Sequence, residues 1–267
     1  MRSGYSTYII EHKPRPFSDC QDSGTALAYL NFRTAYAAMP PHLLPVPRQK
    51  TLSDKNLLLA DRVDKTLIET CLQAPHAGLI ELGEPAVDVV ERIEIMAALD
   101  VIGCSLTSLT ASQINLAPLL CRAAQRRFGM ADITLTAMGL ALQEASINAL
   151  AHGNLGLRSA FEETDDDLDT YYQLVRERAA QDGFKDKRID ILAWQTKDTV
   201  LIAVRDQGKG YKAADRRLPE SSRTPPVDRR KLNDRRQSGR GLDIMQKFSQ
   251  NWWISTPGTS IVMGFDK

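Results

Sequence analysis

One helix with a mixed face constrains this chain most. The segment Thr134 to Ala151 carries apolar side chains at helical spacing, so one side of this helix must pack against a core. Within the apolar segment, Glu144, Asn148 and His152 follow one another at intervals of four residues. Side chains four residues apart lie above one another on a helix, so a carboxylate, an amide and an imidazole form one polar stripe.

The stripe alone has two interpretations. It is either an exposed polar face that ends with His152 and a cap at Gly153, or part of a binding site. A second motif, Asp206-Gln-Gly208-Lys-Gly210, follows a predicted strand and favours the binding site. Its glycines let the backbone approach a flat ligand, and its aspartate can accept a hydrogen bond from an exocyclic amine.

A third motif, Ser238-Gly239-Arg240-Gly241-Leu242, opens a predicted helix. Backbone N–H groups at a helix start bind phosphate, glycine allows close approach, and Arg240 adds a charged planar group. Each glycine motif is weak alone, because both kinds of sequence also occur in plain turns and helix entries. The specific signal is their order: an E-x-x-x-N helix, a strand ending in D-x-G-x-G, a variable loop, and G-x-G at a helix start.

This order resembles the superfamily that includes gyrase, the ninety-kilodalton heat-shock chaperone, histidine kinases and mismatch-repair ATPases. The resemblance covers residues 100 to 267 and is closest to the anti-sigma-factor serine kinase branch, in the runs 148–156 and 239–245. It implies the Bergerat-type ATP-binding fold. That fold is an α/β sandwich of the α+β class, in which helices cover one face of a mixed or antiparallel sheet.

The resemblance also implies a role for each motif residue, with ATP and Mg²⁺ as cofactors. Glu144 would orient or deprotonate the attacking hydroxyl, and Asn148 would hold the Mg²⁺ that bridges the ATP phosphates. The other nucleotide contacts would come from the adenine side (Asp206, Thr259), the start of the ATP lid (Gly208, Gly210), the phosphate side (Gly239, Arg240, Gly241) and His152, whose contact the motif leaves unspecified.

Composition divides the chain into three regions. Residues 1–50 are a proline-rich extension, residues 51–100 a small α/β region, and residues 101–267 the ATP-binding domain. Asp61 follows a predicted strand, so it is either the acidic residue of a degenerate receiver-like unit or the cap of the next helix. We favour the cap, because the remaining pattern is too short for a full receiver.

Hydrophobic periodicity predicts the elements within these regions. Asp132 is predicted to cap the central helix, Gly129 to end the helix before it, Lys197-Asp198 to form a hairpin turn, and the acidic run 162–169 to cap the helix that follows. The predicted helices span residues 24–38, 64–73, 86–98, 115–128, 134–151, 171–181 and 242–249, and the predicted strands residues 56–60, 77–82, 101–107, 188–196, 199–205, 252–255 and 260–265.

Charge and cysteine content exclude several functions. With 34 basic and 33 acidic residues the net charge is +1, so no overall field recruits nucleic acid or a membrane surface. No window approaches the roughly 18 apolar residues of a membrane span, and the start lacks a signal-peptide core, which predicts a cytoplasmic protein. The four cysteines are far apart, which argues against a zinc site or disulfide framework and predicts small buried or half-buried side chains.

A long arginine-rich segment, residues 211–238, separates the two glycine motifs. It is too polar to pack and is predicted to be a mobile lid loop. Its arginines either reach ATP phosphates or an acidic partner, or simply form a solvated loop. We also hypothesise that the acidic run 162–169 screens them when no ligand is bound.

Elimination narrows the function within the superfamily. A histidine kinase needs an acceptor histidine, usually followed by an acidic residue, and His12, His42 and His76 all lack that context. Gyrase and chaperone relatives carry large domains after the ATPase, whereas this chain stops at its last predicted strand. We therefore expect a serine/threonine kinase that phosphorylates an anti-sigma-factor antagonist. The alternative is a non-catalytic module that uses ATP to shape a surface for a sigma factor.

Glu144 favours the kinase, because ATP binding alone needs Asn148 and Asp206 more than a catalytic carboxylate. The resemblance does not extend to the first hundred residues. That region either senses a signal or adds a surface for a homodimer.

Overall fold

The computed structural model describes residues 7–10, 57–82, 92, 96, 101–159, 164, 167–210, 240–255 and 258–267. The helix predicted at 24–38, most of the helix predicted at 86–98 and the arginine-rich segment 211–238 lie outside these ranges. Within the described ranges, no helix is both long and apolar enough to cross a membrane. The same residues contain no group of three or more His, Cys, Asp or Glu side chains that could hold a metal ion.

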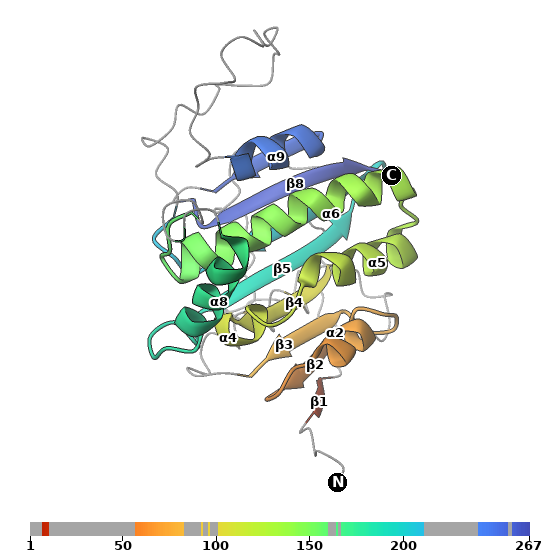
Figure 1. Cartoon of the computed structure of the whole chain (residues 1–267). Coiled ribbons are helices and arrows are strands. Elements are labelled where there is room, and N and C mark those ends of the chain that lie inside the picture. The colour runs from red at the N-terminus through yellow and green to blue at the C-terminus, as the bar shows by residue number, and fades with distance from the viewer. Residues whose placement is uncertain are drawn as a thin grey trace, which may run out of the picture.

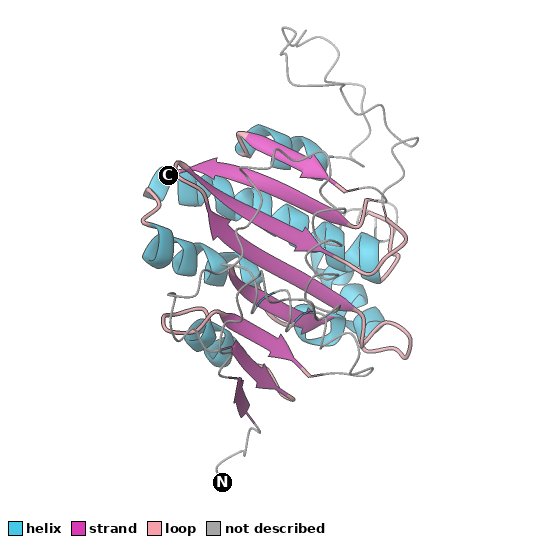
Figure 2. Ribbon diagram, turned by 180° about the vertical axis from the view of Figure 1, so that it is seen from behind, coloured by secondary structure: helices cyan, strands magenta, loops and turns pink. Residues whose placement is uncertain are grey.

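One eight-stranded sheet runs through the molecule in the order β1-β2-β3-β4-β5-β6-β8-β7 (Figures 1 and 2). The neighbours β2, β3 and β4 are parallel, and all other neighbours are antiparallel. The strands are β1 (Thr7–Ile10), β2 (Leu57–Ala60), β3 (Gly78–Glu81), β4 (Ile102–Thr107), β5 (Arg188–Gln195), β6 (Thr199–Arg205), β7 (Asn251–Ile254) and β8 (Ser260–Asp266). The strands of the small N-terminal region therefore extend the sheet of the ATP-binding region, and the division into three domains stays a prediction.

The labelled helices cover one face of this sheet. They lie in front of it in Figure 1 and behind it in Figure 2. They are α2 (Lys65–Cys71), α4 (Ser108–Ala111), α5 (Leu116–Phe128), α6 (Asp132–Ile147), α8 (Leu168–Ala179) and α9 (Arg240–Phe248), with a π-helix η3 (Asn148–Asn154) that continues α6. This architecture confirms the predicted α/β sandwich with a mixed sheet and helices on one face.

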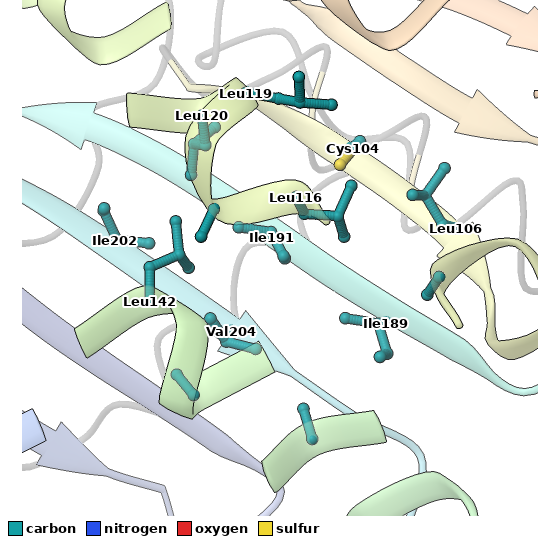
Figure 3. Packing of buried hydrophobic residues seen from close by; sticks show 14 of the residues in the cluster. Cys104, Leu106, Leu116, Leu119, Leu120, Leu142, Ile189, Ile191, Ile202 and Val204 are labelled. Carbon is teal, nitrogen blue, oxygen red and sulfur yellow. The ribbon is translucent and has the colours of Figure 1, made fainter. Parts of the chain in front are cut away.

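The main core lies between the central strands and helices α5 and α6. Alternate side chains of each strand point to the helices, since successive residues of a strand face opposite sides. Ile191 and Ile202 from the sheet thus lie in one cluster with Leu120 and Leu142 from the helices (Figure 3). All four of these side chains are buried, which removes their apolar surface from water and stabilises the fold.

The opposite face of the sheet carries polar groups, among them Asp190 of β5. Its Oδ1 accepts a hydrogen bond from Nε of Arg92 at 2.6 Å, and both side chains are buried. A buried carboxylate needs such a partner, because an unpaired charge is costly away from water. The pair therefore ties residue 92 of the middle region to a central strand of the ATP-binding region.

Three of the cysteines confirm the prediction of buried or half-buried side chains. Cys71 on α2 and Cys104 on β4 are both free and buried, and burial raises the pKa of each thiol. A thiol that stays protonated is a poor nucleophile and a poor metal ligand. Cys121 is half-buried, with its pKa also raised by burial, and Cys20 lies outside the described residues.

Two predicted helix caps are wrong. Asp64, rather than Asp61, caps α2, and its Oδ1 accepts a hydrogen bond from the third N–H of the helix at 2.8 Å. Asp61 lies three residues too early to reach that group, and its receiver-like interpretation stays a hypothesis. Asp132 is the first residue of α6 rather than its cap, and its carboxylate instead accepts a hydrogen bond from Nε2 of Gln125 at 2.8 Å.

Three other local predictions are confirmed. Gly129 ends α5 with a left-handed φ of 70°, a conformation that favours glycine. Asp167 of the acidic run caps α8 by accepting hydrogen bonds from the first turn. Lys197-Asp198 forms the hairpin turn between β5 and β6, where Thr196 N donates to Thr199 O at 2.8 Å.

Candidate functional site

The polar stripe lies where the central helix changes its winding. The α-helix ends at Ile147, and Asn148–Asn154 form a π-helix, closed by a bond of 2.9 Å from Leu155 N to Leu150 O. Periodicity alone predicted one α-helix to residue 151 and missed this change. A π-helix has a wider turn with i→i+5 bonds, so side chains four residues apart no longer lie directly above one another.

Glu144 and Asn148 lie against the start of α9. A Cβ placed on Gly241 would be 2.9 Å from Asn148 Nδ2 and 3.0 Å from Glu144 Oε2, so the glycine is what lets the helix approach. The structure therefore brings the first and third motifs together. Burial raises the pKa of Glu144, and the nearby His152 opposes part of that shift. A carboxylate, an amide and the N–H groups of a helix start share one small region.

His152 occupies a separate position at the exposed end of the stripe. Its Nδ1 lies 2.8 Å from the carbonyl oxygen of Leu157. A carbonyl only accepts, so Nδ1 carries the proton and donates, and in the neutral ring Nε2 is left as an acceptor. The stripe therefore divides: Glu144 and Asn148 meet α9, whereas His152 fastens the loop that follows η3.

Asp206 directly follows β6 and lies over the backbone of Gly153. Its Oδ1 accepts a hydrogen bond from Gly208 N at 2.7 Å, and its own N–H donates to Thr259 O at 2.9 Å. A Cβ on Gly153 would lie 2.5 Å from Asp206 Cγ, and one on Gly208 would overlap the carbonyl of Gly153. Burial raises the pKa of Asp206 to about 6. The second motif and Thr259 are thus together, against the end of the motif helix.

The remaining predicted residues are placed less fully. Gly210 has a left-handed φ of 76°, which favours glycine where the chain leaves the Asp206 loop. Arg240 begins α9, but its side chain and the whole of Gly239 lie outside the described residues. The phosphate contacts assigned to these two residues stay predictions.

Sequence reasoning missed the side chain of Asn154 as part of the site. It is fully buried at the end of η3 and bonds to the backbone of Gln207, next to Asp206. The sequence carried no signal for this burial, because asparagine is usually exposed and one that follows His-Gly at a helix end is expected to face solvent. Its partners could not be known without the fold.

The fold and the site together define an ATP-binding protein of the α/β sandwich class. A family model described as the histidine kinase-like ATPase domain matches residues 107–265, more than half of the chain. The protein therefore belongs to the histidine kinase-like ATPase family. A comparison with curated proteins finds no match.

ATP with Mg²⁺ fits the residues that are present. Mg²⁺ takes oxygen ligands and keeps several waters, so the amide oxygen of Asn148 beside α9 suits it. The first turn of α9 offers N–H groups for phosphate, and Gly241 leaves no side chain in the way. Asp206, half-buried on its glycine loop, can accept a hydrogen bond from the amino group of adenine.

Proposed function

We propose that this protein is an ATP-dependent serine/threonine kinase of the anti-sigma-factor type, which phosphorylates an antagonist protein in a cytoplasmic signalling switch. The position of Glu144 carries this proposal. Its carboxylate lies one helical turn before Asn148 and against Gly241, where the end of a nucleotide held by α9 would lie. Burial raises its pKa, which makes the carboxylate a stronger proton acceptor.

The chemistry is a transfer of the γ-phosphoryl group to a hydroxyl. Glu144 takes the proton of the partner's serine or threonine while the hydroxyl oxygen forms a bond to the γ-phosphorus. The bond from that phosphorus to the bridging oxygen of ADP breaks, and ADP leaves with the electron pair. Asn148 would hold Mg²⁺, which supplies charge neutralisation when bound, and the start of α9 orients the phosphates.

A non-catalytic module is the alternative function. It would bind ATP only to shape a surface for a sigma factor, and it would need Asn148 and Asp206 but no carboxylate at position 144. The kinase is favoured because Glu144 is half-buried against the start of α9. Partial burial of a carboxylate costs hydration free energy, and ATP binding alone does not need a carboxylate at this position.

The test uses ATP with a radioactive γ-phosphate, Mg²⁺ and the small proteins encoded beside the gene. We expect acid-stable label on serine or threonine of one of them. The variant Glu144→Gln keeps the shape of the side chain but removes the base, so we expect labelling to fall at least about 100-fold. Binding of a fluorescent ATP analogue should stay within about threefold, because the lost interaction belongs to the transition state.

Glu177→Gln on the outer helix α8 is the matched control, since it makes the same acid-to-amide change where Glu177 only accepts a hydrogen bond from Gln173. Full labelling by Glu144→Gln would overturn the role of Glu144 as base. Tight ATP binding without labelled protein would favour the non-catalytic module.

A further inference from the structure

Asn154 holds together three parts of the chain from a position with no solvent exposure. Its Nδ2 donates to Ser108 Oγ at 2.9 Å and to the carbonyl oxygen of Arg188 at 3.0 Å. Its Oδ1 accepts a hydrogen bond from Gln207 N at 2.8 Å. An amide has two donor hydrogens and a carbonyl oxygen, and all are used here. The side chain is 0% exposed, so water cannot replace any lost partner.

The partners of Asn154 also bond to one another. Gln207 Oε1 accepts from Arg188 N at 2.8 Å, and Ser108 Oγ donates to Lys187 O at 3.0 Å. Lys187 Nζ donates to the backbone carbonyl of Asn154 at 2.8 Å. We call these five residues the Asn154 network. Because each member is held by at least two bonds, the position of Asn154 relative to Gln207 is strongly determined.

The network lies beside the contact that supports Asp206. In that contact Gly153 touches Asp206. Asn154 follows Gly153 in the chain, and Gln207 follows Asp206. The bond from Gln207 N to Asn154 Oδ1 therefore lies directly next to the contact. Gly153 packs so closely on Asp206 and Gly208 that a single Cβ would not fit. The same bond therefore sets how far the Asp206 carboxylate lies from the helix that carries Asn148.

From this geometry we infer that Asn154 is a positioning residue for adenine recognition. It holds the Asp206 loop at a fixed distance from η3. Asp206 and α9 can then contact the base and the phosphates of one nucleotide at the same time. The inference rests on the proposed ATP site, in which Asp206 contacts the base and α9 the phosphates. Removing Asn154 should weaken contacts to the base much more than contacts to the phosphates.

The test compares two ligands, Mg-ATP and Mg-tripolyphosphate, because only ATP has a base. Binding is measured by calorimetry on the full chain. For Asn154→Ala we expect the dissociation constant of ATP to rise about tenfold, the value of one lost buried hydrogen bond, and that of tripolyphosphate to change less than about twofold. Gln125→Ala is the matched control, since that exposed amide bonds only Asp132 at the outer start of α6.

A purely structural role would lower both affinities by the same factor, and that result would overturn the inference. Gln207→Ala is a milder variant, because it removes the side-chain bond to Arg188 N but keeps the backbone N–H that donates to Asn154 Oδ1. If Asn154→Ala does not fold, the decision falls to Gln207→Ala, for which we expect a selective loss of about threefold for ATP. For Gln207→Ala, an equal loss of affinity for both ligands, or no loss of affinity for ATP, would also overturn the inference. Failure of the unaltered protein to bind ATP would instead count against the proposed function.

Discussion

At the scale of single residues, the burial of Asp206 makes its ionised carboxylate unfavourable for stability. Burial raises its pKa from 3.8 to about 6. Because this folded-state pKa lies above the unfolded value, the native state binds more protons between about pH 4 and pH 6. Stability therefore falls as the pH rises through this window, and above it the ionised carboxylate lowers the free energy of unfolding. That ionised form is also the stronger acceptor for an adenine amino group.

We expect Asp206→Asn to be more stable than the unaltered protein at pH 7.5 and equally stable at pH 4. The gain should be about 1–2 kcal/mol, less than the full pKa shift because the group keeps some contact with water. ATP affinity should fall at least about tenfold. Urea unfolding at the two pH values and titration with a fluorescent ATP analogue measure both effects. The same stability gain at both pH values would contradict the assignment.

Two glycines in the site should respond differently to alanine. A Cβ at Gly241 meets the ends of the flexible side chains of Asn148 and Glu144, which can move aside, so we expect a stability loss below about 1 kcal/mol. The displaced amide and carboxylate should still reduce ATP binding or phosphoryl transfer about tenfold or more. A Cβ at Gly208 meets the backbone of Gly153, and we expect a loss of about 1–3 kcal/mol. Urea unfolding measures the stability loss of each alanine variant. Equal losses for the two variants would contradict the prediction that Gly208 tolerates a Cβ less well than Gly241.

At the scale of elements, α6 contains a glycine that the site does not need. A Cβ on Gly139 would meet only Cys121 Sγ, at an ordinary contact distance of 3.5 Å. Glycine inside a helix costs about 0.5–1 kcal/mol relative to alanine, so Gly139→Ala should raise the free energy of unfolding by about that amount. Thermal unfolding measures the gain, with ATP affinity unchanged as the control. A loss of stability would show that α5 and α6 pack more tightly than this contact indicates.

At the scale of the whole molecule, the sheet crosses the boundary between the predicted regions. β3 pairs with β4, and the Arg92–Asp190 pair joins the same two regions on the other face. We therefore expect one cooperative unfolding transition. Urea unfolding can be followed by labelling of the Cys71 thiol in the N-terminal part and by fluorescence of the buried Trp194 in the ATP-binding part. Two separate midpoints would show that the regions unfold as independent domains.

Most elements were predictable because their signals are local. The alternation in β5, the continuous apolar run in β6 and the helical spacing of Leu142 with its neighbours indicate strands and a helix from a few residues at a time. The errors also have local causes. Asp61, Asp64 and Asp132 are equally good cap residues by type, and only the backbone geometry decides which one reaches a free N–H.

The sequence by itself determined the order of the motifs and the residue types of the site, since glycine, carboxylate and amide positions can be read directly along the chain. Only the tertiary structure decided which of them touch. Gly241 meets Glu144 because α9 packs on α6, and the amide of Asn154 meets Gln207 across 53 positions of sequence. Such contacts depend on how the sheet and the helices on its face bring distant segments of the chain together. No local pattern contains that information, so His152 could be grouped with Asn148 by spacing and yet bond to Leu157 in the fold.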